Sequence, residues 1–95
     1  MRLDWDSTKA RENLRKHGVS FTEASSVFND DHGILLPDHD HSSEEERFVL
    51  IGLNSHLRLL VVVHAYKADA DVIRIISARP ASHSERAQYG AQRLR

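Results

Sequence analysis

The sequence predicts a single α+β domain with two N-terminal helices, a four-stranded antiparallel sheet and a C-terminal helix. Helix-capping patterns near both ends of the chain flank a middle part that is rich in β-branched residues. Short turns join the strand-like stretches of that middle part, and short turns favour antiparallel neighbours. Ninety-five residues suffice for one modest core, so residues 1–95 are expected to fold as one domain.

The two N-terminal helices are predicted from their caps. Asp6 or Ser7 can cap the first helix, and Gly18 follows basic residues in its last turn, as is typical of a helix end. A capping box at residues 20–23 begins a short second helix that extends to about residue 28. Apolar residues recur at helical spacing in both, so one side of each helix is expected to be buried.

Four stretches rich in β-branched and other apolar residues have the composition of strands. The first ends at Pro37, and a polar loop follows it up to residue 46. The third contains an unbroken apolar run, which predicts a central strand that is covered on both faces. The four predicted strands are residues 33–36, 47–53, 57–65 and 72–79.

A second capping box, formed by Ser82 and Glu85, begins the C-terminal helix. Gly90 weakens this helix, and residues 91–95 are expected to fray. Two small N-terminal helices are too few to cover both faces of the sheet. The remaining apolar surface would therefore be closed by the C-terminal helix or by another protein chain.

Composition narrows the class of protein. The chain has no cysteine, no apolar run of membrane-spanning length and no signal-peptide core, so a soluble cytoplasmic protein without disulfides is expected. The net charge of −1 argues against tight, non-specific binding to nucleic acid. Residues 1–50 carry −5 and residues 51–95 carry +4, which indicates either a positive patch near the last strand and helix or two halves that neutralise each other.

Two arginines in the last predicted strand are the first candidates for a functional site. Side chains alternate along a strand, so Arg74 and Arg79 would lie on opposite faces of a regular one. A buried guanidinium needs water, an anion or a carboxylate, so each arginine either binds a phosphate or pairs with an acid of the same chain. Both arginines can serve one site only if the strand bends or ends before Arg79.

The sequence resembles the BrnT family of bacterial ribonuclease toxins, which belong to type II toxin–antitoxin systems. The most specific matching segments are K-H-G-V-S-F at residues 16–21 and R-I-I-S-A-R at residues 74–79. The resemblance extends from Leu3 to Tyr89. Further matching segments include W-D-S-T-K (5–9), D-H-S-S-E-E-E-R (40–47) and L-V-V-V (60–63).

The resemblance implies a fold similar to that of the RelE-type toxins and an endoribonuclease activity that blocks translation. It also implies neutralisation by a cognate BrnA-type antitoxin with a ribbon-helix-helix DNA-binding part, in a two-plus-two complex. DNA would be bound only through the antitoxin. Neither a cofactor nor a membrane is implied.

RNA can be cleaved without metal when its own 2′-hydroxyl attacks the adjacent phosphate. A protein assists by removing that proton, protonating the leaving 5′-oxygen and placing positive charge beside the phosphorane. Arginine forks suit the charge role, whereas histidine and glutamate suit proton transfer. The candidate catalytic residues are Glu46, Arg47, His64, Arg74 and Arg79, and the candidate RNA-binding residues are Lys9, His41 and Arg86.

Several alternatives stay open at the level of the sequence. His64 ends an apolar strand and could be a purely structural histidine, and Arg47 could pair with Glu45 or Glu46. The chain could also be a non-catalytic antitoxin-binding module that acts in transcriptional autoregulation. A metal-dependent hydrolase that uses the D-H-D-H segment at 38–41 is a third option, but adjacent ligands on a loop lack the spacing of known sites, so no metal is expected.

Overall fold

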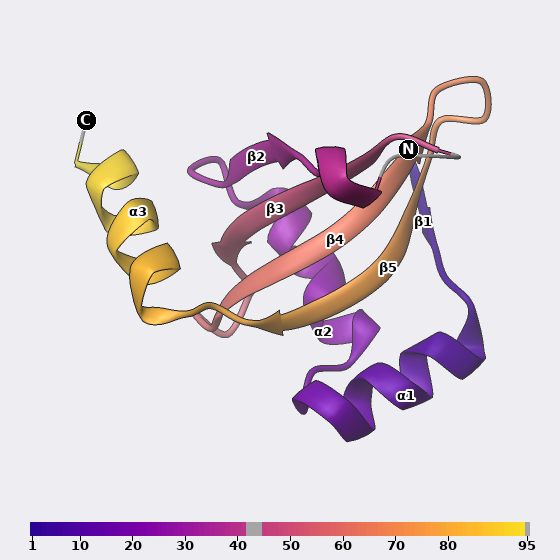
Figure 1. Cartoon of the computed structure of the whole chain (residues 1–95), viewed down its shortest axis with the longest axis horizontal. Coiled ribbons are helices and arrows are strands. Elements are labelled where there is room, and N and C mark those ends of the chain that lie inside the picture. Colours follow the sequence, from indigo (N-terminus) through magenta and orange to yellow (C-terminus); the bar gives the residue numbers. More distant parts are fainter. Residues whose placement is uncertain (42–44, 95) are drawn as a thin grey trace.

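A mixed five-stranded sheet is the centre of the structure, which is a computed structural model that describes residues 1–41 and 45–94, with His41 described by its backbone alone. The strands lie in the order β1-β5-β4-β3-β2 (Figure 1). In chain order the elements are β1 (Arg2–Asp4), α1 (Ser7–His17), α2 (Phe21–Ser25), the 3-10 turn η1 (Ser26–Asn29), β2 (Ile34–Pro37), the 3-10 turn η2 (His39–His41), β3 (Arg47–Leu53), β4 (Leu59–Lys67), β5 (Val72–Pro80) and α3 (His83–Arg93).

The α+β class and the antiparallel run of β2 to β5 are confirmed, and β4 is the central strand as predicted. The prediction of a four-stranded, purely antiparallel sheet is wrong in one respect. Residues 2–4 form a fifth strand, β1, that pairs parallel to β5 with Leu3 opposite Ile73. Three residues are too few to show an alternating pattern, so the sequence of β1 does not distinguish it from a coil.

The larger core lies where α1 and α2 pack on one face of the sheet, which we call the helix-covered face. Leu60 and Val62 of β4 contribute to it together with Phe21 of α2. Asp6 caps α1 by accepting hydrogen bonds from the backbone N–H groups of Thr8 and Lys9. The second helix is shorter than predicted, because its last turn narrows into the 3-10 turn η1.

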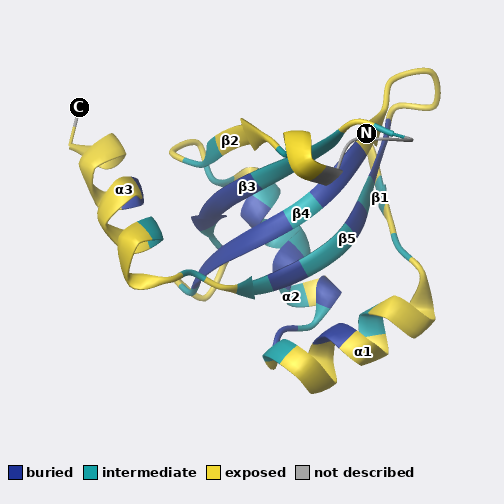
Figure 2. Ribbon diagram, viewed as in Figure 1, coloured by how far each residue is buried: buried dark blue, intermediate teal, exposed yellow. Residues whose placement is uncertain are grey.

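The opposite face, which we call the open face, is covered only at one end. There Tyr89 of α3 packs on Ile51, Leu59 and Val61 in a smaller apolar cluster. Most of α3 is exposed, and the helix projects away from the sheet (Figures 1 and 2). The predicted weakness at Gly90 does not end the helix, which continues to Arg93.

Tyr89 is the residue that fastens α3 to the sheet. Its hydroxyl donates a 2.6 Å hydrogen bond to Oδ2 of Asp30, which also accepts a bond from the Leu53 N–H at 2.8 Å. Burial and the nearby Asp30 carboxylate raise the pKa of Tyr89 to about 12. The hydroxyl is therefore a permanent donor at neutral pH.

Replacing Tyr89 with phenylalanine is expected to lower the free energy of unfolding by about 1.5–3 kcal/mol, the usual contribution of a hydrogen bond to a charged acceptor. Urea denaturation followed by circular dichroism measures this change. Tyr66→Phe is the matched control, because the Tyr66 hydroxyl donates a 3.2 Å bond to Asp71 at an exposed site. Equal losses in the two variants would show that Asp30 does not anchor α3.

Candidate functional site

A β-bulge in β5 brings the two predicted arginines to the same face of the sheet. Ser77 lies opposite Val63 and Ile75 lies opposite His64, so Ile76 is an extra residue between two consecutive pairs. Arg74 is paired with Ala65 and Arg79 with Val61, and these two residues of β4 share the open face. The condition set by the sequence, that the strand must depart from regular alternation, is therefore met.

Arg47 joins Arg74 at one end of the open face. Both are cross-strand neighbours of Ala65, one from β3 and one from β5. Each sits one strand spacing from Ala65, so their Cα atoms lie on the order of 10 Å apart. Because alanine has the smallest side chain after glycine, the two long arginine side chains have room to approach each other above it.

A carboxylate lies between these two arginines. Both oxygens of Glu45 accept hydrogen bonds from Nη2 of Arg74, at 2.5 and 2.6 Å. The same carboxylate is 3.7 Å from Nε of Arg47. Arg74 and Glu45 are each about two-thirds buried, with side-chain exposures of 34% and 29%. This pairing favours a strong, oriented charge interaction over a loose surface contact.

Arg79 stands at the other end of the open face. Its partner on β4, Val61, is four residues from Ala65, which is the partner of Arg74. Four residues along a strand correspond to about 13 Å. Nη1 and Nη2 of Arg79 donate hydrogen bonds of 2.7 and 2.9 Å to the two oxygens of Glu85, in a two-pronged pair. Glu85 also closes the capping box of α3 with Ser82. The arginine thus connects the end of β5 to the start of α3.

The pairing with Arg79 makes Glu85 a source of acid sensitivity. The hydrogen bonds from Arg79 lower the pKa of Glu85 from 4.5 to about 2. A lowered pKa in the folded state means that Glu85 stabilises the fold above pH 4.5 and loses this effect as the pH falls to about 2.

We expect Glu85→Gln to flatten the decrease in unfolding free energy between pH 4.5 and 2. Urea denaturation at a series of pH values tests this. Glu12→Gln, at an exposed position of α1, is the control and should leave the curve of the parent protein unchanged. Parallel curves for the parent and Glu85→Gln would contradict the assignment.

Lys9 lies beside the bulge, where α1 runs along β5. Side chains of both elements line a polar cavity of about 370 Å³ there. Lys9 lines it with Lys16 and His17 from the same helix, and Ile76 and Ser77 line it from β5. Ser77 is cross-strand to Val63 and so belongs to the open face. Lys9 and a residue of the open face therefore line the same cavity.

Asn13 holds α1 against this edge of β5. Its side-chain amide accepts a hydrogen bond from the Ala78 N–H at 3.1 Å and donates one to the Ala78 carbonyl at 2.8 Å. It donates another to the Val19 carbonyl at 2.9 Å. One side chain thus satisfies backbone groups that a neighbouring strand would otherwise pair.

The other predicted site residues are dispersed. Glu46 is exposed and lines a cavity of about 280 Å³ with Arg47 and His39. Arg86 is exposed on α3. His64 lies on the helix-covered face, opposite to the arginines, since its partner is Ile75. The side chain of His41 lies outside the described part of the chain.

Among residues 1–40 and 45–94, no three His, Asp or Glu side chains form a group that could hold a metal ion. In that same part of the chain, no helix has the length and hydropathy needed to cross a membrane.

Sequence reasoning missed the central position of Glu45 and the role of Asn13. The sequence indicates Glu45 as a possible partner of Arg47, but three consecutive glutamates do not show which one faces the sheet. A buried asparagine inside an amphipathic helix is a signal that could have been used, since buried amides are nearly always hydrogen-bonded.

Comparison with known proteins identifies the class of molecule to which this fold and arginine-bearing face belong. Residues 5–85 match the pattern described as "Ribonuclease toxin, BrnT, of type II toxin-antitoxin system". The chain belongs to the BrnT family. It is thus an endoribonuclease toxin by family, with RNA as substrate and an antitoxin as partner.

A solved structure agrees on the fold. The crystal structure of the Brucella abortus ribonuclease toxin BrnT, at 1.1 Å resolution, superposes with a TM-score of 0.66 and 24% sequence identity. The similarity covers 87% of this chain and 99% of the Brucella protein. Among proteins with curated descriptions, none matches this sequence. The resemblance inferred from the sequence motifs is confirmed.

Proposed function

We propose that this toxin cleaves RNA on the open face without a metal ion and thereby blocks translation. The observation that carries the proposal is the bulge at Ile76, which places Arg74 and Arg79 on the face that also bears Arg47. Arginines fixed on strands are suited to hold phosphate oxygens because planar forks match their geometry. Their side chains are only partly buried, so a polyanion can reach them.

In the proposed reaction, the RNA 2′-oxygen attacks the adjacent phosphorus and the bond to the 5′-oxygen breaks. Arg47 and Arg74 would contact the phosphate and stabilise the added negative charge of the transition state. The carboxylate of Glu45, which lies between them, or that of Glu46, which lines a cavity with Arg47, would take the 2′-hydroxyl proton. A solvent water would protonate the leaving 5′-oxygen. A guanidinium supplies the positive charge, so this chemistry does not require a metal.

His64 has no role in the proposed reaction, because its ring is on the opposite face of the sheet. Lys9 and Arg86 are proposed to bind flanking phosphates, Lys9 from the edge of β5 and Arg86 from α3. Arg79 would hold the RNA about 13 Å from the reacting phosphate, as estimated from strand geometry.

RNA must displace carboxylates to engage these arginines. Glu45 occupies Arg74, and Glu85 occupies Arg79, each through two hydrogen bonds. These pairs show that both guanidiniums are already oriented toward an anion. The same pairs favour the second candidate function, a non-catalytic antitoxin-binding module that acts in transcriptional autoregulation and keeps its arginines neutralised.

The proposed antitoxin is a BrnA-type protein with a ribbon-helix-helix part, in a two-plus-two complex that binds DNA only through the antitoxin. Support comes from the open face itself. Its half-buried Val49 and Val63 lie between the arginine ends, so the face combines apolar and positive contacts. A segment with apolar and acidic side chains would complement it and would exclude RNA.

Incubating the purified chain with a defined RNA tests the proposal. We expect cleavage that persists in EDTA, yields 2′,3′-cyclic phosphate and 5′-hydroxyl ends, and stops when the antitoxin is added. Loss of cleavage in EDTA with recovery on adding a divalent metal would overturn the metal-independent mechanism. A folded chain that binds the antitoxin but leaves RNA intact would establish the non-catalytic module instead.

A further inference from the structure

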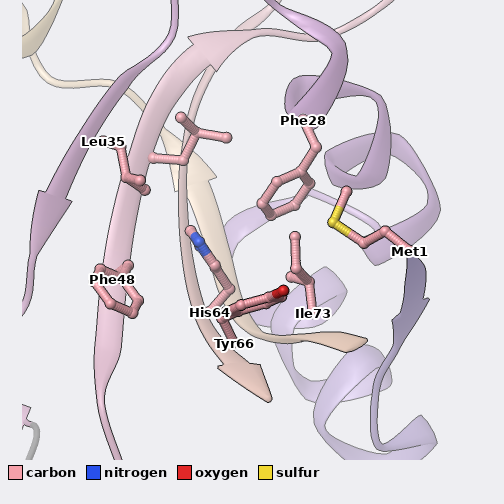
Figure 3. A pocket seen from close by; sticks show the side chains of 8 residues that line it. Met1, Phe28, Leu35, Phe48, His64, Tyr66 and Ile73 are labelled. Carbon is pink, nitrogen blue, oxygen red and sulfur yellow. The ribbon is translucent and has the colours of Figure 1, made fainter. Parts of the chain in front are cut away.

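The helix-covered face contains an apolar cavity that the proposed RNA chemistry does not use. It has a volume of about 370 Å³ and lies at the end of the sheet that α1 and α2 leave uncovered. Six elements or their ends contribute side chains. Figure 3 shows these side chains arranged around His64. The lining residues are Met1, Phe28, Leu35, Phe48, Leu50, His64, Tyr66 and Ile73.

His64 is the polar group within this apolar lining that is most deeply buried, with 4% of its surface exposed. Its Nδ1 is 3.2 Å from the Val62 carbonyl oxygen, which can only accept, so Nδ1 carries the proton. In the neutral ring Nε2 is then an acceptor. Burial lowers the pKa of His64 below 6.5, which keeps the ring neutral at physiological pH.

Aromatic rings surround the imidazole. The Phe28 ring meets it edge-on at a centroid distance of 4.8 Å, and the Phe48 ring is tilted at 6.1 Å. Tyr66 and Met1 stand at the exposed mouth, with 46% and 73% of their surfaces accessible. The cavity thus has aromatic walls, the His64 imidazole among them, and an open entrance, which are the features of a small-molecule site.

We propose that this cavity binds an aromatic group that carries a single N–H or O–H donor, with the donor directed at Nε2 of His64. The apolar walls would bury the ring, and the hydrogen bond would orient it. A nucleobase fits less well, because it would bring several polar groups into a lining whose polar side chains are those of His64 and Tyr66, and Tyr66 stands at the exposed mouth. The site lies on the opposite face from Arg74 and Arg79, so its occupancy does not depend on the RNA proposal.

Indole and indene are suitable probes because they have nearly the same shape and only indole has an N–H donor. Proton NMR of the full chain would follow the His64 ring resonances during titration with each compound. Indole is expected to shift them and to bind about 3- to 10-fold more tightly than indene, the range expected for one neutral hydrogen bond. No shift with indole, or equal affinities for the two compounds, would overturn the proposal.

A variant gives a second, independent measurement. His64→Phe keeps an aromatic ring and removes the acceptor, so it should abolish the preference for indole over indene. His56→Phe, in the exposed turn between β3 and β4, should preserve that preference. If His64→Phe fails to fold, the comparison of indole with indene on the parent protein still decides the question.

The aromatic donor can come from a free metabolite or from a tyrosine or tryptophan of another protein. Repeating the titration on the purified toxin–antitoxin complex separates these sources. Indole binding that is retained in the complex assigns the cavity to a free molecule. Binding that is lost in the complex, and restored when the antitoxin's aromatic residues are replaced with alanine, assigns it to the antitoxin. Cleavage assays on the same samples report the RNA activity separately.

Discussion

Replacing Arg74 with alanine is expected to lower the rate of RNA cleavage by about 100- to 1000-fold, the usual effect of removing one group that stabilises transition-state charge. Arg74 is the arginine whose guanidinium is held most closely, by two hydrogen bonds to Glu45. It lies in the same cross-strand row as Arg47. Loss of its fork would leave the phosphate with one partner in that row.

The Arg74 experiment needs controls for charge and for folding. Arg74→Lys keeps the charge without the planar fork and should recover only part of the rate. Arg11→Ala removes an exposed arginine on α1 and should cleave RNA as the parent does. Circular dichroism establishes that each variant is folded. If the Arg74→Ala toxin is folded and fully active, the proposal that RNA is cleaved on the open face is wrong.

Replacing Asn13 with alanine is expected to cost about 2–4 kcal/mol of unfolding free energy. The substitution removes three hydrogen bonds and leaves the N–H and C=O of Ala78 and the C=O of Val19 without their partner. Asn13 is 6% exposed, so water cannot readily replace the lost amide. A loss of this size is a large fraction of the typical stability of a small domain.

Thermal denaturation measures the Asn13 effect, since each kcal/mol corresponds to about 4–8 °C for a domain of this size. Asn29→Ala is the matched control, because Asn29 is exposed at the end of η1 and its replacement should change the midpoint little. Similar midpoints for the two variants would show that the backbone groups bound by Asn13 find other hydrogen-bond partners when it is replaced.

Most of the fold follows from local signals in the sequence. The caps at Asp6, Ser20 and Ser82 lie where the patterns predicted them, because capping depends on residues within one turn of each other. Strand β1 could not be predicted, because its pairing with β5 joins residues that are 70 apart in sequence. Tertiary pairing, not local propensity, makes those three residues a strand.

The candidate site was predictable in its residue types and not in its arrangement. The arginines were identified because charged residues inside an apolar strand need a partner. The face on which each one lies depends on the bulge at Ile76, and an Ile-Ile pair carries no signal for a bulge. The sequence likewise does not show that His64 lies on the opposite face from the arginines, because this depends on the register of β4 against β5.

The bulge also gives β5 a spare residue. Arg79 is five residues after Arg74, an odd spacing that would place the two side chains on opposite faces of a regular strand. Because the bulge leaves one residue between them unpaired, their partners on β4 are four residues apart, an even spacing. A relative that lacks one residue anywhere between them would have a regular strand, with both guanidiniums still on one side. An insertion that leaves the bulge in place would instead turn one of them over. Single deletions in this strand should therefore be tolerated, whereas single insertions that keep the bulge should be selected against.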